Sequence, residues 1–158
     1  SDKWFDKSGN DLHGTVSGST VENAPSDSSG LVYEEGTFTP TITGITSVGY
    51  ANQSGFYTRI GNMVSFNAYI ETNSGTLASA NVEIQDLPFT SNSTTQNRGG
   101  AFITYKDNFE EDGSSGHFLF VNPNTTTIEI YRDNGTRFIG TYMDSSSISL
   151  RINGFYYV

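Results

Sequence analysis

Apolar and polar side chains alternate along most of the chain from Gly36 onward, the pattern of β-strands with one buried face. The clearest case is segment 55–71, where Gly61-Asn62 separates two alternating runs. In the second run one face carries Val64, Phe66, Ala68 and Ile70. This segment predicts two strands joined by a tight turn.

Further strands are predicted at short, regular intervals. In segment 36–43, Pro40 lacks an N–H, which predicts that this strand lies at an edge of the sheet. Segment 117–121 is apolar on both faces, which predicts a central strand. The inward positions expected elsewhere are Val82, Ile84, Ala101, Ile103, Tyr105, Ile148, Leu150 and Ile152. No window shows a sustained apolar period of 3.6 residues, so we predict an all-β, antiparallel β-sandwich or jelly-roll-like domain.

Turn residues add detail to this prediction. Asn134-Gly135 lies between two alternating runs and is the preferred pair for a type I′ hairpin turn. By contrast, residues 1–35 are rich in Gly, Ser, Asn and Asp, with one short candidate strand at 14–17. We therefore predict an irregular neck or linker over 1–35 and a β-sandwich domain over 36–158.

Charge and composition exclude several functions. The chain has 158 residues and a formal net charge of −9, which argues against nucleic acid and against an anionic membrane surface as partners. It contains no cysteine, so disulfides and thiol chemistry are excluded. No stretch approaches the roughly 20 apolar residues of a membrane-spanning helix.

Catalytic motifs are absent. The chain has no nucleophile elbow, no phosphate-binding glycine loop and no zinc-protease motif. Its two histidines, His13 and His117, are expected to be ordinary polar residues at turns. A carboxylate pair for glycoside hydrolysis could come from any acidic loop, so it is not specifically indicated. We expect a non-enzymatic protein.

The acidic segment 106–117 is the strongest local concentration of charge. Asn108, Glu110 and Asp112 imitate the start of a calcium loop, but Leu119 stands where the motif needs a bidentate Glu. We expect a solvated loop and no cofactor, with a weak calcium site or a ligand-contacting rim as the alternatives.

Sugar recognition combines aromatic rings with planar polar groups, and several predicted loops carry both. The candidate ligand-binding residues are Tyr50, Asn52, Asn92, Gln96, Arg98, Tyr105, Asp107, Tyr131, Arg132, Asp133 and Arg137. Loops of any Ser-, Thr- and Asn-rich protein look similar, so composition alone does not choose among them.

Four motifs occur in an order that resembles a recurrent C-terminal module of bacteriophage tail fibres and tailspikes. They are "GTFTP" at 36–40, "GFYTRIGNMV" at 55–64, "LPFTS" at 87–91 and "GFY" at 154–156. The resemblance implies a homotrimeric receptor-binding tip at the distal end of a tail fibre. Such a tip belongs to the virion, acts outside the cell, and binds a bacterial surface glycan or protein. The shared motifs look structural and name no binding residue.

Other functions remain open at this point. The chain could be a monomeric carbohydrate-binding module of a secreted bacterial enzyme, and it could be a trimerisation or folding cap of the fibre. A small hydrolase that cleaves capsule or slime is a further alternative. The molar mass in solution would distinguish the monomeric module from the trimeric alternatives, and the release of reducing ends would identify the hydrolase.

Overall fold

The computed structural model describes residues 3–4, 14–15, 32–109 and 116–158 of the chain. The chain divides into two units, residues 1–31 and 32–158. In the first unit, strand β1 (Lys3–Trp4) pairs antiparallel with strand β2 (Gly14–Thr15). This pair lies within the predicted neck, whose role as a linker stays a prediction.

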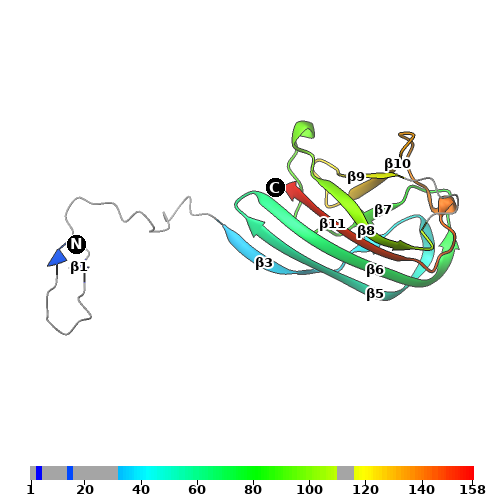
Figure 1. Cartoon of the computed structure of the whole chain (residues 1–158), viewed down its shortest axis with the longest axis horizontal. Coiled ribbons are helices and arrows are strands. Elements are labelled where there is room, and N and C mark those ends of the chain that lie inside the picture. Colours follow the sequence, from blue (N-terminus) through cyan, green and yellow to red (C-terminus); the bar gives the residue numbers. More distant parts are fainter. Residues whose placement is uncertain (1–2, 5–13, 16–31, 110–115) are drawn as a thin grey trace. The chain divides into compact units, whose positions relative to one another are not determined.

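The regular secondary structure of the second unit is almost entirely β (Figure 1). Its strands are β3 (Tyr33–Phe38), β4 (Thr41–Ile42), β5 (Ile45–Ile60), β6 (Met63–Leu77), β7 (Glu83–Gln85), β8 (Gly100–Asp107), β9 (His117–Val121), β10 (Ile128–Arg132) and β11 (Ser149–Tyr157). Two short 3₁₀ turns, η1 (Thr95–Asn97) and η2 (Gly140–Tyr142), complete it. The described ranges contain no α-helix, and none of their helical segments is long and apolar enough to cross a membrane. The all-β prediction is confirmed.

One antiparallel sheet contains all nine strands of this unit, in the order β3-β5-β6-β11-β8-β9-β10-β7-β4. Strands β3 and β4 are the two edges of the sheet, yet only Thr39 and Pro40 separate them along the chain. The two edges must therefore approach each other, and the sheet curls into two layers (Figure 1). The first layer contains β3, β5, β6, β11 and β8, and the second contains β9, β10, β7 and β4.

The segment around Pro40 differs from its prediction in one respect. The expected single strand at 36–43 is two strands on opposite edges, with the buried Pro40 in the corner between them. The edge position itself is confirmed, because β3 has only β5 as a neighbour. Strand β3 also begins at Tyr33, three residues before the predicted start of the sandwich at Gly36.

Inward-facing side chains of both layers form one core. From β6, Val64, Phe66, Ala68 and Ile70 are all buried, as the alternation predicted. The other predicted inward residues that are buried are Val82, Ile84, Ile148, Leu150 and Ile152. Strand β9 is central, with Leu119 and Val121 buried, but its outer face leaves Phe118 and Phe120 partly exposed.

Both predicted turns exist, with different geometries. Ile60 pairs with Met63, and Gly61 has a φ of 62°, so Gly61-Asn62 forms a two-residue turn with the positive φ at its first position, as in type II′. At the second turn, the N–H of Arg132 donates to the carbonyl of Thr136 at 2.8 Å, and Gly135 alone has a positive φ, 81°. This is a three-residue loop with a glycine bulge, so the type I′ prediction is wrong.

A β-bulge reorients the end of strand β8. Ile103 pairs with Ile152, whereas Tyr105 pairs with Arg151, which leaves Thr104 as the extra residue. The extra residue shifts the alternation by one position, so Tyr105 points outward and is 49% exposed. Ala101 and Ile103 pack against the core as predicted, but the inward position predicted for Tyr105 is wrong.

Candidate functional site

Most of the predicted ligand-binding residues lie at one or the other of two opposite ends of the sandwich. The carbonyl of Val32 accepts a hydrogen bond from Gly61, and that of Tyr157 accepts one from Asn92. We call this the Val32 end; it contains Asn92, Gln96 and Arg98. Strand β8 leaves this end at Gly100 and reaches Asp107, about 20 Å away at roughly 3.3 Å per residue.

The opposite end, here called the Asp107 end, gathers a second group of the candidates. Asn52, Glu71, Ser149 and Asp107 follow one another across four neighbouring strands. Asp133 is exposed in the turn after β10. Arg132, at the end of β10, places its guanidinium 4.5 Å from the centre of the Tyr142 ring. The strand register therefore brings Asn52, Tyr105, Asp107, Arg132 and Asp133 to one end, where Tyr105 lines a shallow groove with Phe102 and His117.

Two of the candidates hold the backbone in place. The hydroxyl of Tyr50 accepts a hydrogen bond from the backbone N–H of Ile42 at 3.0 Å. The side-chain oxygen of Asn92 accepts one from the backbone N–H of Thr94 at 2.8 Å. The first contact holds strand β4 against β5 and the second fixes the loop before η1, so a structural role accounts for these two residues.

Tyr131 and Arg137 belong to a cluster on the outside of the second layer, which we call the outer ion network: Glu83, Glu129, Tyr131 and Arg137. Arg137 binds Glu83 at 2.5 Å and also binds Glu129. The hydroxyl of Tyr131 donates to Glu129 at 3.1 Å, and the Arg137 guanidinium lies 5.1 Å from the Tyr131 ring centre. Tyr131 and Arg137 are thus both held by contacts within the outer ion network.

The electrostatics of this network keep Glu129 ionised. Desolvation by itself would raise the pKa of Glu129, but a hydrogen bond from Asn122 and the charge of Arg137 outweigh it and lower that pKa. The pKa of Arg137 is raised, because hydrogen bonds with Tyr131 and Glu83 and the charge of Glu129 outweigh its own desolvation. In this network one guanidinium, that of Arg137, binds two carboxylates.

The predicted calcium loop is described only in part. The amide of Asn108 donates to the carbonyl of Ser147 at 3.1 Å, while Glu110, Asp112 and His13 lie outside the described residues. Within the described ranges, no group of three or more His, Cys, Asp or Glu side chains could hold a metal ion. The calcium alternative stays a prediction.

Two residues at the borders of the acidic loop are not solvated turn residues. Phe109 is buried and stacks on Phe138 with 4.9 Å between ring centres. His117 packs edge-on against both rings, 5.6 Å from Phe109 and 5.0 Å from Phe138. The expectation of an ordinary polar turn residue is wrong for His117, because it begins strand β9 beside this aromatic cluster.

The main surface feature was not predicted from the sequence. On the outside of the first layer, Phe56, Phe102 and Phe155 are 56%, 60% and 48% exposed. Cross-strand pairing puts Phe56, Asn67, Asn153 and Phe102 in one row, with Ser65 and Phe155 in the next. We call these six residues the aromatic face.

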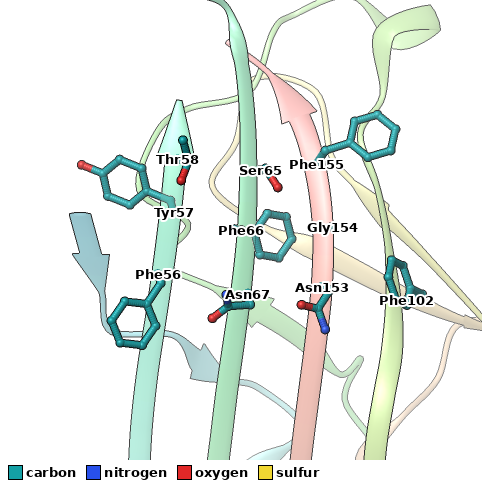
Figure 2. A pocket seen from close by; sticks show the side chains of 10 residues that line it. All are labelled: Phe56, Tyr57, Thr58, Ser65, Phe66, Asn67, Phe102, Asn153, Gly154 and Phe155. Atoms are coloured by element: carbon teal, nitrogen blue, oxygen red, sulfur yellow. The ribbon is translucent and has the colours of Figure 1, made fainter. Parts of the chain in front are cut away.

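The aromatic face contains a shallow groove of about 340 Å³. Figure 2 shows Phe56 and Phe102 on opposite sides of it, with Asn67 and Asn153 between them. No Asp, Glu, Lys or Arg lines this groove. The face is bordered by Glu35 on edge strand β3 and by Arg151, whose guanidinium lies 4.9 Å from the Tyr69 ring centre. Such a neutral surface can accept an apolar partner without desolvating a charge.

Comparison with known proteins identifies a relative of the fold. No protein-family model matches the chain, and no curated protein matches it. Among solved structures, the Dettilon tailspike protein (gp208) is similar, with a TM-score of 0.65 and 19% sequence identity. The match covers 79% of this chain and 24% of the tailspike chain, so this chain spans about a quarter of that protein's length. At this identity, the likeness establishes a shared fold.

Proposed function

We propose that this chain is the non-enzymatic receptor-binding tip of a bacteriophage tail fibre or tailspike. In this proposal three identical chains sit at the distal end of the fibre on the virion and attach to a bacterial surface glycan or protein. The observation that carries it is the fold shared with a segment of a phage tailspike over 79% of the chain. The ordered tail-fibre-like motifs between Gly36 and Tyr156 support it independently.

The Asp107 end suits receptor contact better than the Val32 end. The sandwich unit begins at Val32, so a fibre connected through the preceding residues reaches the sandwich at that end. Asn52, Asp107 and Asp133 are exposed at the other end and offer amide and carboxylate groups to sugar hydroxyls or to a protein. Three weak sites on one trimer then bind a repetitive cell surface by avidity.

Attachment without bond cleavage is part of the proposal. Glu83 and Glu129 face each other on neighbouring strands, an arrangement that invites comparison with a glycosidase pair. A glycosidase needs one carboxyl group with a raised pKa, whereas Arg137 binds both carboxylates and the pKa of Glu129 is lowered. We therefore expect no reducing ends when host polysaccharide is incubated with the protein; their release would contradict this part.

Adsorption of the fluorescently labelled chain to cells that the full-length parent fibre recognises tests the proposal. We expect the double variant Asp107→Ala/Asp133→Ala to adsorb about tenfold less, because two exposed polar groups are lost from each of three sites. The matched control is Gln96→Ala/Arg98→Ala, which removes two exposed polar side chains from the Val32 end and should leave adsorption unchanged. Failure of the unaltered chain to adsorb would contradict receptor binding, and a loss only in the control would move the site to the Val32 end.

A further inference from the structure

We infer that the aromatic face is the surface through which copies of this chain contact one another. The inference rests on the trimer of the proposed function and adds the face that forms the contact. Its basis is the position of Phe56, Phe102 and Phe155 on one flat, charge-free part of the outer sheet surface.

The three exposed rings border one groove, with Asn67 and Asn153 between Phe56 and Phe102. Each ring leaves on the order of 100 Å² in contact with water, given its exposed fraction and the usual area of a phenylalanine side chain. On the same face, Ile60 and Met63 are 42% and 38% exposed and extend this surface toward the Val32 end. Single exposed phenylalanines are common, but three that share one groove indicate an interaction surface.

Charge favours a second copy as the occupant. The chain carries a formal net charge of −9, so two copies repel each other wherever their carboxylates meet. The groove between Phe56 and Phe102 is lined without any charged residue. The first layer can therefore approach a sister chain here with no like-charge contact and no buried unpaired ion.

Shape also favours a sheet over a sugar. A small-ligand site encloses most of its ligand, whereas this groove is shallow and its floor is the outer surface of β6 and β11 (Figure 2). The amide of Asn153 already donates to the Thr104 hydroxyl at 2.9 Å, so it is partly committed within the chain. Flat sheet faces pack on each other at about 10 Å with interdigitating side chains, which matches rings rising beside asparagines.

Cysteine trapping tests this contact, because the chain contains no cysteine. We expect Asn67→Cys, at the centre of the aromatic face, to form covalently linked chains with a short bis-maleimide cross-linker. The matched control is Phe118→Cys, on the exposed face of β9, where 52% of the phenylalanine is accessible. It should give only monomer on a denaturing gel. Equal cross-linking at both positions, or none at Asn67→Cys, would overturn the inference.

A second variant set tests whether the rings carry the contact. In the Asn67→Cys background, Phe102→Ser/Phe155→Ser should reduce cross-linked product by at least about tenfold, because most of the buried apolar area is lost. Phe118→Ser in the same background should leave it unchanged. Circular dichroism of each variant verifies that the sheet is retained, which is expected because the substituted side chains are exposed. Undiminished cross-linking of the double variant would overturn the inference.

The same proteins separate this inference from the proposed function. If Asn67→Cys is not cross-linked but the unaltered chain still adsorbs to cells, the inference fails and receptor binding stands. If cross-linking succeeds and adsorption fails, receptor binding falls while the contact between copies is supported. Protection of the Asn67→Cys thiol by host polysaccharide, without cross-linking, would assign the face to a ligand and overturn the inference.

Discussion

The outer surfaces of the two layers of the sandwich expose different kinds of side chain to water. The second layer carries the outer ion network, in which Glu83, Glu129 and Arg137 bind one another. The first layer carries the aromatic face, where Phe56 and Phe102 stand in water beside uncharged amides. A surface whose charges are already paired gains little from a partner, whereas exposed rings are removed from water only by one. Strand β9 of the second layer also exposes Phe118 and Phe120, so the contrast is between the outer ion network and the aromatic face and not between whole layers.

The largest expected effect comes from breaking the ion network. Arg137→Ala leaves Glu83 and Glu129 opposed with no counter-charge, and we expect the free energy of unfolding to fall by about 2 kcal/mol at neutral pH. Urea unfolding measures this loss. The companion variant Arg137→Ala/Glu83→Gln should recover part of it, because only one carboxylate then lacks a partner; no recovery would show that the repulsion is negligible.

The pH dependence of the stability of Arg137→Ala tests the role of Arg137 further. The folded-state pKa of Glu129 is lowered from its ordinary 4.5, so its stabilisation is present above that value and lost as pH falls through the folded pKa. The stability difference between the unaltered chain and Arg137→Ala should therefore narrow as the pH falls below 4.5. Urea unfolding at several acid pH values measures it, and a constant difference would contradict the assigned role of Arg137.

A second loss of stability is expected at alkaline pH, from the core beneath the aromatic face. Burial raises the pKa of Tyr156 to about 12, from an ordinary value of 10.0. Because this pKa is raised, its contribution to the free energy of unfolding is fully present below pH 10 and is lost as the pH rises toward 12. The expected loss is roughly 2 kcal/mol by pH 11.5. Tyr156→Phe should remove this pH dependence of the free energy of unfolding. At neutral pH it costs about 1 kcal/mol, because Phe89 loses the acceptor of its N–H.

A substitution at the border of the aromatic face should lower the free energy of unfolding by less. Arg151→Ala removes a guanidinium that lies over Tyr69 and Tyr105 on an exposed strand surface, and we expect a loss of about 0.5 kcal/mol. Urea unfolding of this variant and of Arg137→Ala compares the loss of an exposed arginine with the loss of a partly buried arginine that binds two carboxylates. Similar losses for the two variants would contradict the distinction drawn between the two surfaces.

The effect on the single chain within the aromatic face should be smaller than that of Arg137→Ala. Phe155→Ser should lower the stability of the dissociated chain by about 1 kcal/mol, since only about half of the side chain is buried in its own chain. Unfolding at high dilution measures this value, and unfolding at high concentration measures the additional stabilisation by association. A large loss at high dilution would mean that the ring supports the fold and not a contact.

Much of the fold follows from the local pattern of residues. The inward set on β6 from Val64 to Ile70 was predictable because a period of two leaves only one way to bury four apolar side chains. The outward turn of Tyr105 was not, because the extra residue at Thr104 depends on the register with β11. The corner at Pro40 likewise depends on where the sheet closes, which no local pattern records.

The candidate sites depend even more on topology. Asn52 and Asp107 could be proposed from loop composition, but only the strand order places them at the same end and separates them from Arg98. The aromatic face unites residues 56, 102 and 155, which become neighbours only through the order β5-β6-β11-β8. The available signal was a phenylalanine at outward positions of strands whose other outward residues are mostly polar.

The central claim is that the aromatic face lies against sister chains in solution. The most direct measurement is the absolute molar mass of the full, unaltered chain by light scattering on a sizing column, over a range of concentrations. The account predicts a mass near three times 17.2 kDa, which Phe102→Ser/Phe155→Ser lowers toward 17.2 kDa. A mass of 17.2 kDa for the unaltered chain at every concentration would contradict it.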